Sequence, residues 1–170
     1  MIKAILSSNK IYSTSPEAFS LFEKSRFGEK SGKRILYSPS EAIFLSEKEK
    51  ISVFLNSKPL SPDELLKKLK KQDKKIETKL SVFTDLRKKG YIVKTALKFG
   101  AEFRVYNKGV KPGQDHARWI LQTFSSSEKL DWQDFSAKNR VAHSTKKKLL
   151  IAIVDEESSI TYYEISWLKP

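Results

Sequence analysis

The chain of 170 residues contains no cysteine, only two histidines and six glycines. Without cysteine it can hold neither a disulfide nor a thiolate zinc site. It has no apolar run long enough to span a membrane, and its N-terminal segment turns polar too early for a good secretory signal, so we expect a cytoplasmic protein. The scarcity of histidine leaves His116 and His143 as the only imidazoles that could transfer protons near neutral pH.

Acidic residues are outnumbered, since 33 lysines and arginines stand against 20 aspartates and glutamates and give a formal net charge of +13. This excess favours a polyanionic partner, and with an aromatic content of 11% it indicates nucleic acid. A protein that merely carries many solvated lysines is the alternative. We assign the lysine-rich run 67–75 to the solvent face of a helix and give it no role in a site.

The first half of the chain alternates short strand-like and helix-like segments. Three helices are predicted to begin at a Ser-Pro pair, because serine can cap a helix and proline suits its first position. The pairs are Ser15-Pro16, Ser38-Pro39 and Ser61-Pro62. The third helix is expected to continue to Gly90, since its leucines recur at helical spacing.

Beyond Gly90, five segments rich in β-branched and aromatic residues are typical of strands. They are 91–100, 101–109, 117–126, 148–157 and 160–170, and a predicted helix at 129–145 interrupts them. The sequence therefore predicts an α+β fold. We expect a small mixed helix and strand domain at residues 1–75, followed at 76–170 by a domain in which helices flank a mixed β-sheet.

Three side chains could together cleave RNA without a metal ion. Such a cleavage needs a base for the 2′-OH proton, an acid for the departing 5′-oxygen and a cation for the charge on phosphorus. Tyr106 ends a strand, His116 follows a Pro-Gly turn, and Lys147 lies among three lysines. Taken singly, the tyrosine could be a packing residue and the lysine could be solvated. His143, among small and apolar residues, is interpreted as structural or merely tolerated.

The stretches "GYIVKTALKFGAEFRVYNKG", "DHARWIL" and "RVAHSTKKKLLIAIVDEESSITYYEISWLKP" closely resemble the catalytic domain of archaeal tRNA-splicing endonucleases. The likeness covers residues 84–170, about half of the chain, and includes the order and spacing of the tyrosine, histidine and lysine. The N-terminal half is similar only in size and in its texture of helices and strands. Ala96 departs from the family pattern, which has glycine at this position.

The resemblance implies that Tyr106 is the general base, His116 the general acid and Lys147 the cation at the transition state. Lys146 and Lys148 would then contact phosphates or face solvent. Strand alternation places Lys147 on the other face from its two neighbours. The resemblance implies no metal ion and no other cofactor.

Arg140 matches a family arginine that stacks on a base of the substrate, a role suited to a planar and weakly hydrated cation. A surface ion pair is the alternative for Arg140. The implied substrate is precursor tRNA folded into two bulges separated by a short helix, cut to leave a 2′,3′-cyclic phosphate and a 5′-OH. The implied class is thus a tRNA-intron endonuclease of lyase type.

Two cuts need two active sites, and this chain has one set of the three residues. The resemblance therefore implies a homotetramer, or a heterotetramer with a paralogous structural subunit. The terminal strand 160–170 could pair with a partner. Glu128, Asp131 and Asp134 could dock on another subunit, although Asp131 could instead cap a helix.

Two other functions compete with this interpretation. The chain could be a non-catalytic RNA-binding or structural subunit of such a complex, which would predict an incomplete set of catalytic residues. It could also be a metal-dependent nuclease that uses carboxylates of Asp155, Glu156 and Glu157, although these look like a turn.

Overall fold

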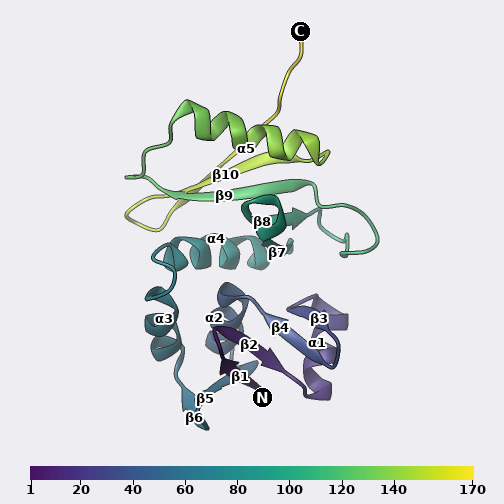
Figure 1. Cartoon of the computed structure of the whole chain (residues 1–170), viewed down its shortest axis with the longest axis vertical. Helices are drawn as coiled ribbons and strands as arrows, with labels where there is room; N and C mark the ends of the chain where they lie inside the picture. Colours follow the sequence, from purple (N-terminus) through teal and green to yellow (C-terminus); the bar gives the residue numbers. More distant parts are fainter. The chain divides into compact units, whose positions relative to one another are not determined.

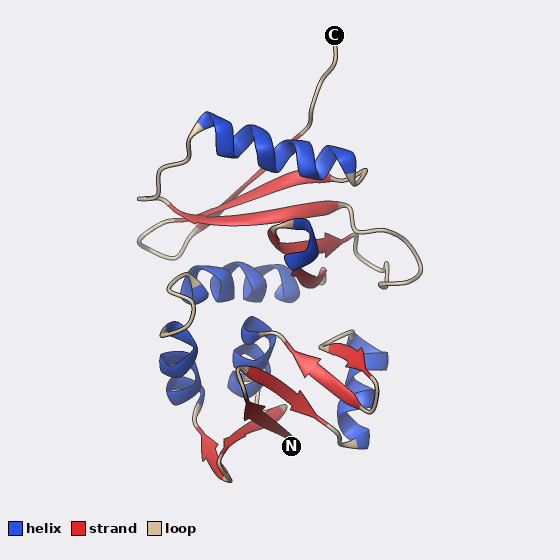
Figure 2. Ribbon diagram, viewed as in Figure 1, coloured by secondary structure: helices blue, strands red, loops and turns tan.

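The computed structural model describes all 170 residues, which form two compact units, Met1–Leu80 and Ser81–Pro170. Figure 1 labels most of the helices and strands of each unit, and Figure 2 distinguishes helices from strands by colour. No helix combines the length and the apolar character needed to cross a bilayer.

The first unit contains a six-stranded sheet in the order β3-β4-β2-β1-β5-β6. Its strands are β1 (Ile2–Ser7), β2 (Lys10–Ser13), β3 (Glu29–Ser31), β4 (Arg34–Tyr37), β5 (Ile51–Leu55) and β6 (Lys58–Leu60). Only β1 and β5 run parallel; the other neighbours are antiparallel. Ser8 and Asn9 turn the chain between β1 and β2 with positive φ angles of 49° and 62°, as a tight two-residue hairpin requires.

The three helices predicted from Ser-Pro pairs are confirmed as α1 (Pro16–Ser25), α2 (Pro39–Glu47) and α3 (Pro62–Lys70). In each of them the serine before the proline accepts a hydrogen bond from the backbone N–H three residues later. In α2 and α3 a glutamate at that third position also accepts from the backbone N–H of the serine. These reciprocal bonds fix where the two helices begin.

The prediction of one helix from Ser61 to Gly90 was wrong, because the chain turns between α3 and α4 (Ile76–Lys88). The carboxylate of Asp73 accepts a hydrogen bond from the backbone N–H of Lys75 at 2.9 Å and pairs with Lys79 Nζ at 2.7 Å. An aspartate that bonds to nearby backbone offers the chain an alternative to the helical ladder. The two three-residue strands β3 and β6 were also not predicted.

Gly28 follows α1 at a point where a side chain would not fit. Its φ is +79°, and a Cβ atom there would lie 2.3 Å from Ile35 Cγ2. Its N–H donates to the buried carboxylate of Glu41 at 2.9 Å, and the same carboxylate accepts from the backbone N–H of Ser38 at 2.9 Å. Glu41 thus ties the chain after α1 to the start of α2.

The second unit contains a five-stranded mixed sheet in the order β11-β10-β9-β8-β7. Its elements are β7 (Ile92–Ala96), the short 3-10 helix η1 (Leu97–Phe99), β8 (Ala101–Tyr106), β9 (Trp119–Ser125), α5 (Trp132–Ser144), β10 (Lys148–Val154) and β11 (Ile160–Ile165). Strands β9 and β10 are parallel, and the other neighbours are antiparallel. The five strands and the helix predicted beyond Gly90 are therefore present, and the predicted α+β class is confirmed.

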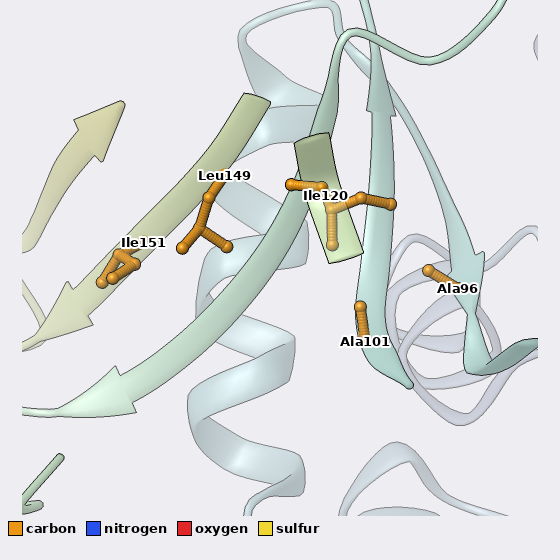
Figure 3. Packing of buried hydrophobic residues seen from close by; sticks show 6 residues of the cluster. Ala96, Ala101, Ile120, Leu149 and Ile151 are labelled. Atoms are coloured by element: carbon orange, nitrogen blue, oxygen red, sulfur yellow. The ribbon is translucent and has the colours of Figure 1, made fainter. Parts of the chain in front are cut away.

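Within this unit, helix α5 covers one face of the sheet (Figure 1). Ala142 of α5 belongs to a buried cluster with Ile120, Leu149 and Ile151 of β9 and β10, and Figure 3 shows these three strand residues together with Ala96 and Ala101. The aromatic ring of Phe83 in α4 contacts that of Phe103 in β8 at 6.0 Å between centroids. Ala96 has a φ of −130°, which any residue can adopt, so the backbone there does not require glycine.

Candidate active site

A cavity of about 700 Å³ lies in the second unit near the C-terminal end of α5. Tyr106, His116 and Lys147 all line it, although they are separated by up to 41 positions in the chain, from 106 to 147. They come from the end of β8, from the loop between β8 and β9, and from the turn between α5 and β10. We call this hollow the α5 cavity.

Tyr106 is the last residue of β8, and its place follows from strand pairing. Arg104 pairs with Ile120 of β9, and Ile120 packs beneath α5, so Arg104 lies on the sheet face that α5 covers. Tyr106 is two positions further along the strand and therefore lies on the same face. The side chain of Tyr106 is only 5% exposed. Its position at the end of the strand lets it line the cavity.

His116 lies in a loop whose shape a Pro-Gly turn helps to fix. The backbone N–H of Gln114 donates to the carbonyl of Lys111 at 3.0 Å, and Gly113 between them has a φ of 93°. Proline at the second and glycine at the third position match a type II turn. The backbone N–H of His116 donates to Asp115 Oδ1 at 2.7 Å, and the histidine itself is exposed.

Lys147 is held by the hydrogen bonds that end α5. Its backbone N–H donates to the carbonyl of Ala142 at 2.8 Å, and the N–H of Lys146 donates to that of His143 at 3.0 Å. This pair of bonds is a Schellman motif, in which the residue after the C-cap takes a left-handed conformation. Here that residue is Lys146, with a φ of 58°, where glycine is the usual choice. The helix end thus sets the position of Lys147.

The three consecutive lysines have different surroundings. Lys148 begins β10, and its Nζ pairs with Glu164 of β11 at 3.1 Å. The indole Nε1 of Trp119 also donates to Glu164, at 2.7 Å. The hydrogen bonds from Trp119 and then from Lys148 lower the pKa of Glu164. Lys147, in contrast, lines the α5 cavity together with Lys146.

The ammonium group of Lys147 donates to the carbonyl of Thr145 at 3.0 Å and lies 5.3 Å from the centroid of the Phe99 ring. Burial lowers the pKa of Lys147, and the positive charges of Arg104 and then Lys98 lower it further. Both of these cations line the cavity. Sequence reasoning did not identify them, although the spacing of Arg104 and Tyr106 on one strand face was an available signal.

A second hollow of about 600 Å³ also borders the lysine turn, and Lys146, Lys147 and Lys148 all contribute to its lining. Its lining includes His143 and Trp167, whose rings meet edge to face at 4.2 Å between centroids. His143 is exposed rather than part of the core. Arg140 is also exposed on α5 and lines neither hollow.

The acidic residues singled out from the sequence have local partners. Asp131 caps α5 by accepting from the backbone N–H of Asp134 at 2.8 Å, which confirms the capping alternative. Asp134 pairs with Lys138 at 2.6 Å. Asp155 lies in the turn between β10 and β11 and accepts from the backbone N–H groups of two later residues in that turn. Docking of the acidic residues on another subunit stays a prediction.

Comparison with known proteins gives matches over both units. The sequence model of the family described as "tRNA intron endonuclease, catalytic C-terminal domain" matches residues 76–162, and that of "tRNA intron endonuclease, N-terminal domain" matches residues 2–66. A tRNA-splicing endonuclease of Pyrococcus abyssi is 39% identical over 170 residues, which cover 99% of this chain and 98% of the relative. A relative with the same name in Methanothermobacter thermautotrophicus is 39% identical over 150 residues, which cover 88% of this chain and 87% of the relative. Another in Nanoarchaeum equitans is 43% identical over 136 residues, which cover 76% of this chain and 87% of the relative.

Proposed function

The chain belongs to the tRNA intron endonuclease family and is an endonuclease of tRNA splicing, and from this we propose that it cuts precursor tRNA at bulge-helix-bulge sites without a metal ion. The 2′-OH attacks the adjacent phosphorus, the bond from phosphorus to the 5′-oxygen breaks, and the products are a 2′,3′-cyclic phosphate and a 5′-OH. This is a transesterification of the lyase type. We place the activity in the cytoplasm and the catalytic residues in a domain at 76–170, with residues 1–75 as a separate N-terminal domain.

The proposed roles follow the chemistry of the three side chains in the α5 cavity. Tyr106 acts as the phenolate and becomes a phenol when it takes the proton of the 2′-OH, and the protonated imidazole of His116 gives a proton to the departing 5′-oxygen. The ammonium group of Lys147 stabilises the charge that builds on the phosphorane oxygens. Each proton lost by the substrate is matched by one that it receives, so the step is balanced.

The observation that carries this proposal is the convergence of Tyr106, His116 and Lys147 on one cavity from three separate elements. Two contacts favour Lys147 over Lys148 as the catalytic lysine. The backbone N–H of Lys147 is held by the Ala142 carbonyl at the end of α5, whereas the side chain of Lys148 is paired with Glu164. We assign Lys146, Lys148 and Arg140 to binding of the RNA.

One chain has one such set of residues, and excision of an intron needs two cuts. We therefore propose a homotetramer, or a heterotetramer with a paralogous structural subunit. The edge position of β11, which pairs only with β10, supports a partner strand there. The alternative function, a non-catalytic RNA-binding or structural subunit, is less well supported because all three proposed catalytic residues line the cavity.

The test is single-turnover cleavage of a bulge-helix-bulge RNA in EDTA, with the ends of the products mapped. We expect a cyclic phosphate and a 5′-OH from the wild type. Tyr106→Phe and His116→Ala should each lower the rate by about 10²–10⁴-fold while RNA affinity stays close to that of the wild type. His143→Ala is the matched control and should cleave at the wild-type rate. Full activity of His116→Ala, or loss of wild-type cleavage in EDTA, would reject the mechanism.

A further inference from the structure

The α5 cavity holds more positive charge than the proposed catalytic residues supply. Beside His116 and Lys147, its lining includes Lys98 of η1 and Arg104 of β8. Lys98 is exposed, whereas Lys147 is half-buried, so the former lies nearer the solvent side of the same cavity. These two additional cations have no role in the proton transfers described above.

One carboxylate, that of Asp115, lines the cavity beside these cations, and its Oδ1 accepts a hydrogen bond from the backbone N–H of His116 at 2.7 Å. Burial lowers the pKa of Lys147, and the positive charges of Arg104 and then Lys98 lower it further. Cations gathered along one cavity raise the local concentration of anions such as phosphate groups.

Two of the cations lie near the same aromatic ring, that of Phe99. The Nζ of Lys98 lies 5.2 Å from the centroid of its ring, and the Nζ of Lys147 lies 5.3 Å from the same centroid. Each distance is within the range of a cation–π interaction. Phe99 itself packs against the buried cluster beneath α5, so the ring that both ammonium groups share is anchored in the core.

The size of the cavity allows more than one anionic group. Its volume of about 700 Å³ is that of a site for a whole small-molecule ligand rather than for a single phosphate group. An RNA strand brings one negative charge with every nucleotide, so a strand that places its scissile phosphate at Lys147 carries a second phosphate close by.

We propose that Lys98 and Arg104 form a second phosphate subsite, which binds the phosphodiester next to the scissile one in the RNA strand. This inference rests on the proposed function, because it takes the occupant of the cavity to be the RNA that is cut. Lys98 acts as a point charge at the entrance, and the guanidinium of Arg104 acts deeper in the cavity. Neither residue takes part in proton transfer.

The experiment combines Lys98→Gln with a change in the substrate. The RNA carries a 2′-deoxy nucleotide at the cleavage position, so that it binds without being cut. In further RNAs a neutral methylphosphonate replaces the phosphodiester on the 5′ or the 3′ side of the scissile one. We expect Lys98→Gln to weaken binding of the all-phosphate RNA by about fivefold and to lower the salt slope by about one. On one of the two methylphosphonate RNAs the variant and the wild type should bind equally.

Lys88→Gln is the matched control, because it removes an exposed lysine of the same unit that does not line the cavity. It should bind and cleave as the wild type does. Arg104→Gln should repeat the pattern of Lys98→Gln, and melting curves of all variants confirm that they are folded. An equal loss of affinity for all the RNAs would overturn the subsite.

A large loss of the single-turnover rate of Lys98→Gln at saturating enzyme, with affinity unchanged, would also overturn the subsite, because Lys98 would then act on the scissile phosphate itself. Failure of the proposed function is distinguishable from both outcomes. In that case the wild-type protein would not cleave the unmodified RNA, whatever residue stands at position 98.

Discussion

Replacing Lys146 with glycine should make the protein more stable and weaken its binding to RNA. Lys146 follows the C-cap of α5 with a φ of 58°, a conformation that costs a residue with a side chain about 1–2 kcal/mol. Glycine removes this cost, but it also gives the unfolded chain more freedom, which opposes folding by about 0.4–1 kcal/mol. The expected net gain is therefore about 0.5–1 kcal/mol.

For a unit of the size of Ser81–Pro170 this gain corresponds to a rise in Tm of about 2–8 °C. Thermal unfolding followed by tryptophan fluorescence reports on this unit, because all three tryptophans of the chain lie in it. The same variant loses a cation from the lining of both hollows. We expect the slope of log K against log salt for RNA binding to fall by about 0.9, as for one lost phosphate contact.

Two further variants separate the backbone from the charge. Lys146→Asn also removes the charge, but asparagine tolerates the left-handed conformation. Lys146→Ala removes the charge and keeps the energetic cost of the left-handed conformation. The expected order of Tm is glycine above asparagine above alanine, with the same loss of RNA affinity in all three. A glycine variant no more stable than the alanine variant would refute the backbone argument, and an unchanged salt slope would refute the phosphate contact.

Three other predictions test the stability of each unit and the electrostatics of the cavity. Gly28→Ala should destabilise the first unit by about 2–4 kcal/mol, because it combines a positive φ with a steric clash, and limited proteolysis should then cleave that unit first. Tyr162→Phe should destabilise the second unit by about 1–2 kcal/mol, since it removes a 2.6 Å hydrogen bond to Asp85. Burial alone would raise the pKa of Asp85, but hydrogen bonds including that from Tyr162 lower it overall. The difference in stability between the wild type and Tyr162→Phe should therefore shrink as the pH falls through that lowered pKa. A difference in stability that does not depend on pH would contradict this explanation. In Lys98→Gln, the pH at which cleavage is lost on the alkaline side should rise, because removing a nearby positive charge raises the pKa of Lys147. A shift of this loss to lower pH would refute the prediction.

The sequence predicted those features that local chemistry determines. Serine followed by proline identified the starts of α1, α2 and α3, because the capping side chain and the helix it caps are neighbours in the chain. The five strands of the second unit were predicted from their composition. The prediction of a single helix from Ser61 to Gly90 was wrong because the carboxylate of Asp73 accepts a hydrogen bond from the backbone N–H of Lys75, which outweighs the helical spacing of the leucines.

The surroundings of the catalytic candidates depend on contacts that the sequence does not display. The difference between Lys147 and Lys148 was expected from strand alternation, but the partner of Lys148, Glu164, is 16 positions away on another strand. Lys98 was not identified because it is one lysine among many until the 3-10 helix brings it to the cavity. The roles of the catalytic candidates and the boundary between residues 75 and 76 stay predictions.

Under the role that we propose for Lys147, the bond from its backbone N–H to the Ala142 carbonyl couples activity to the fraying of a helix end. Helix termini open far more often than the sheet beneath them, through local events that leave the rest of a protein folded. Each opening of the last turn of α5 would release the anchor of Lys147 while the sheet stays intact. Hydrogen–deuterium exchange at this single amide therefore measures the fraction of folded molecules that are momentarily inactive, and on warming, activity should decline before the protein unfolds.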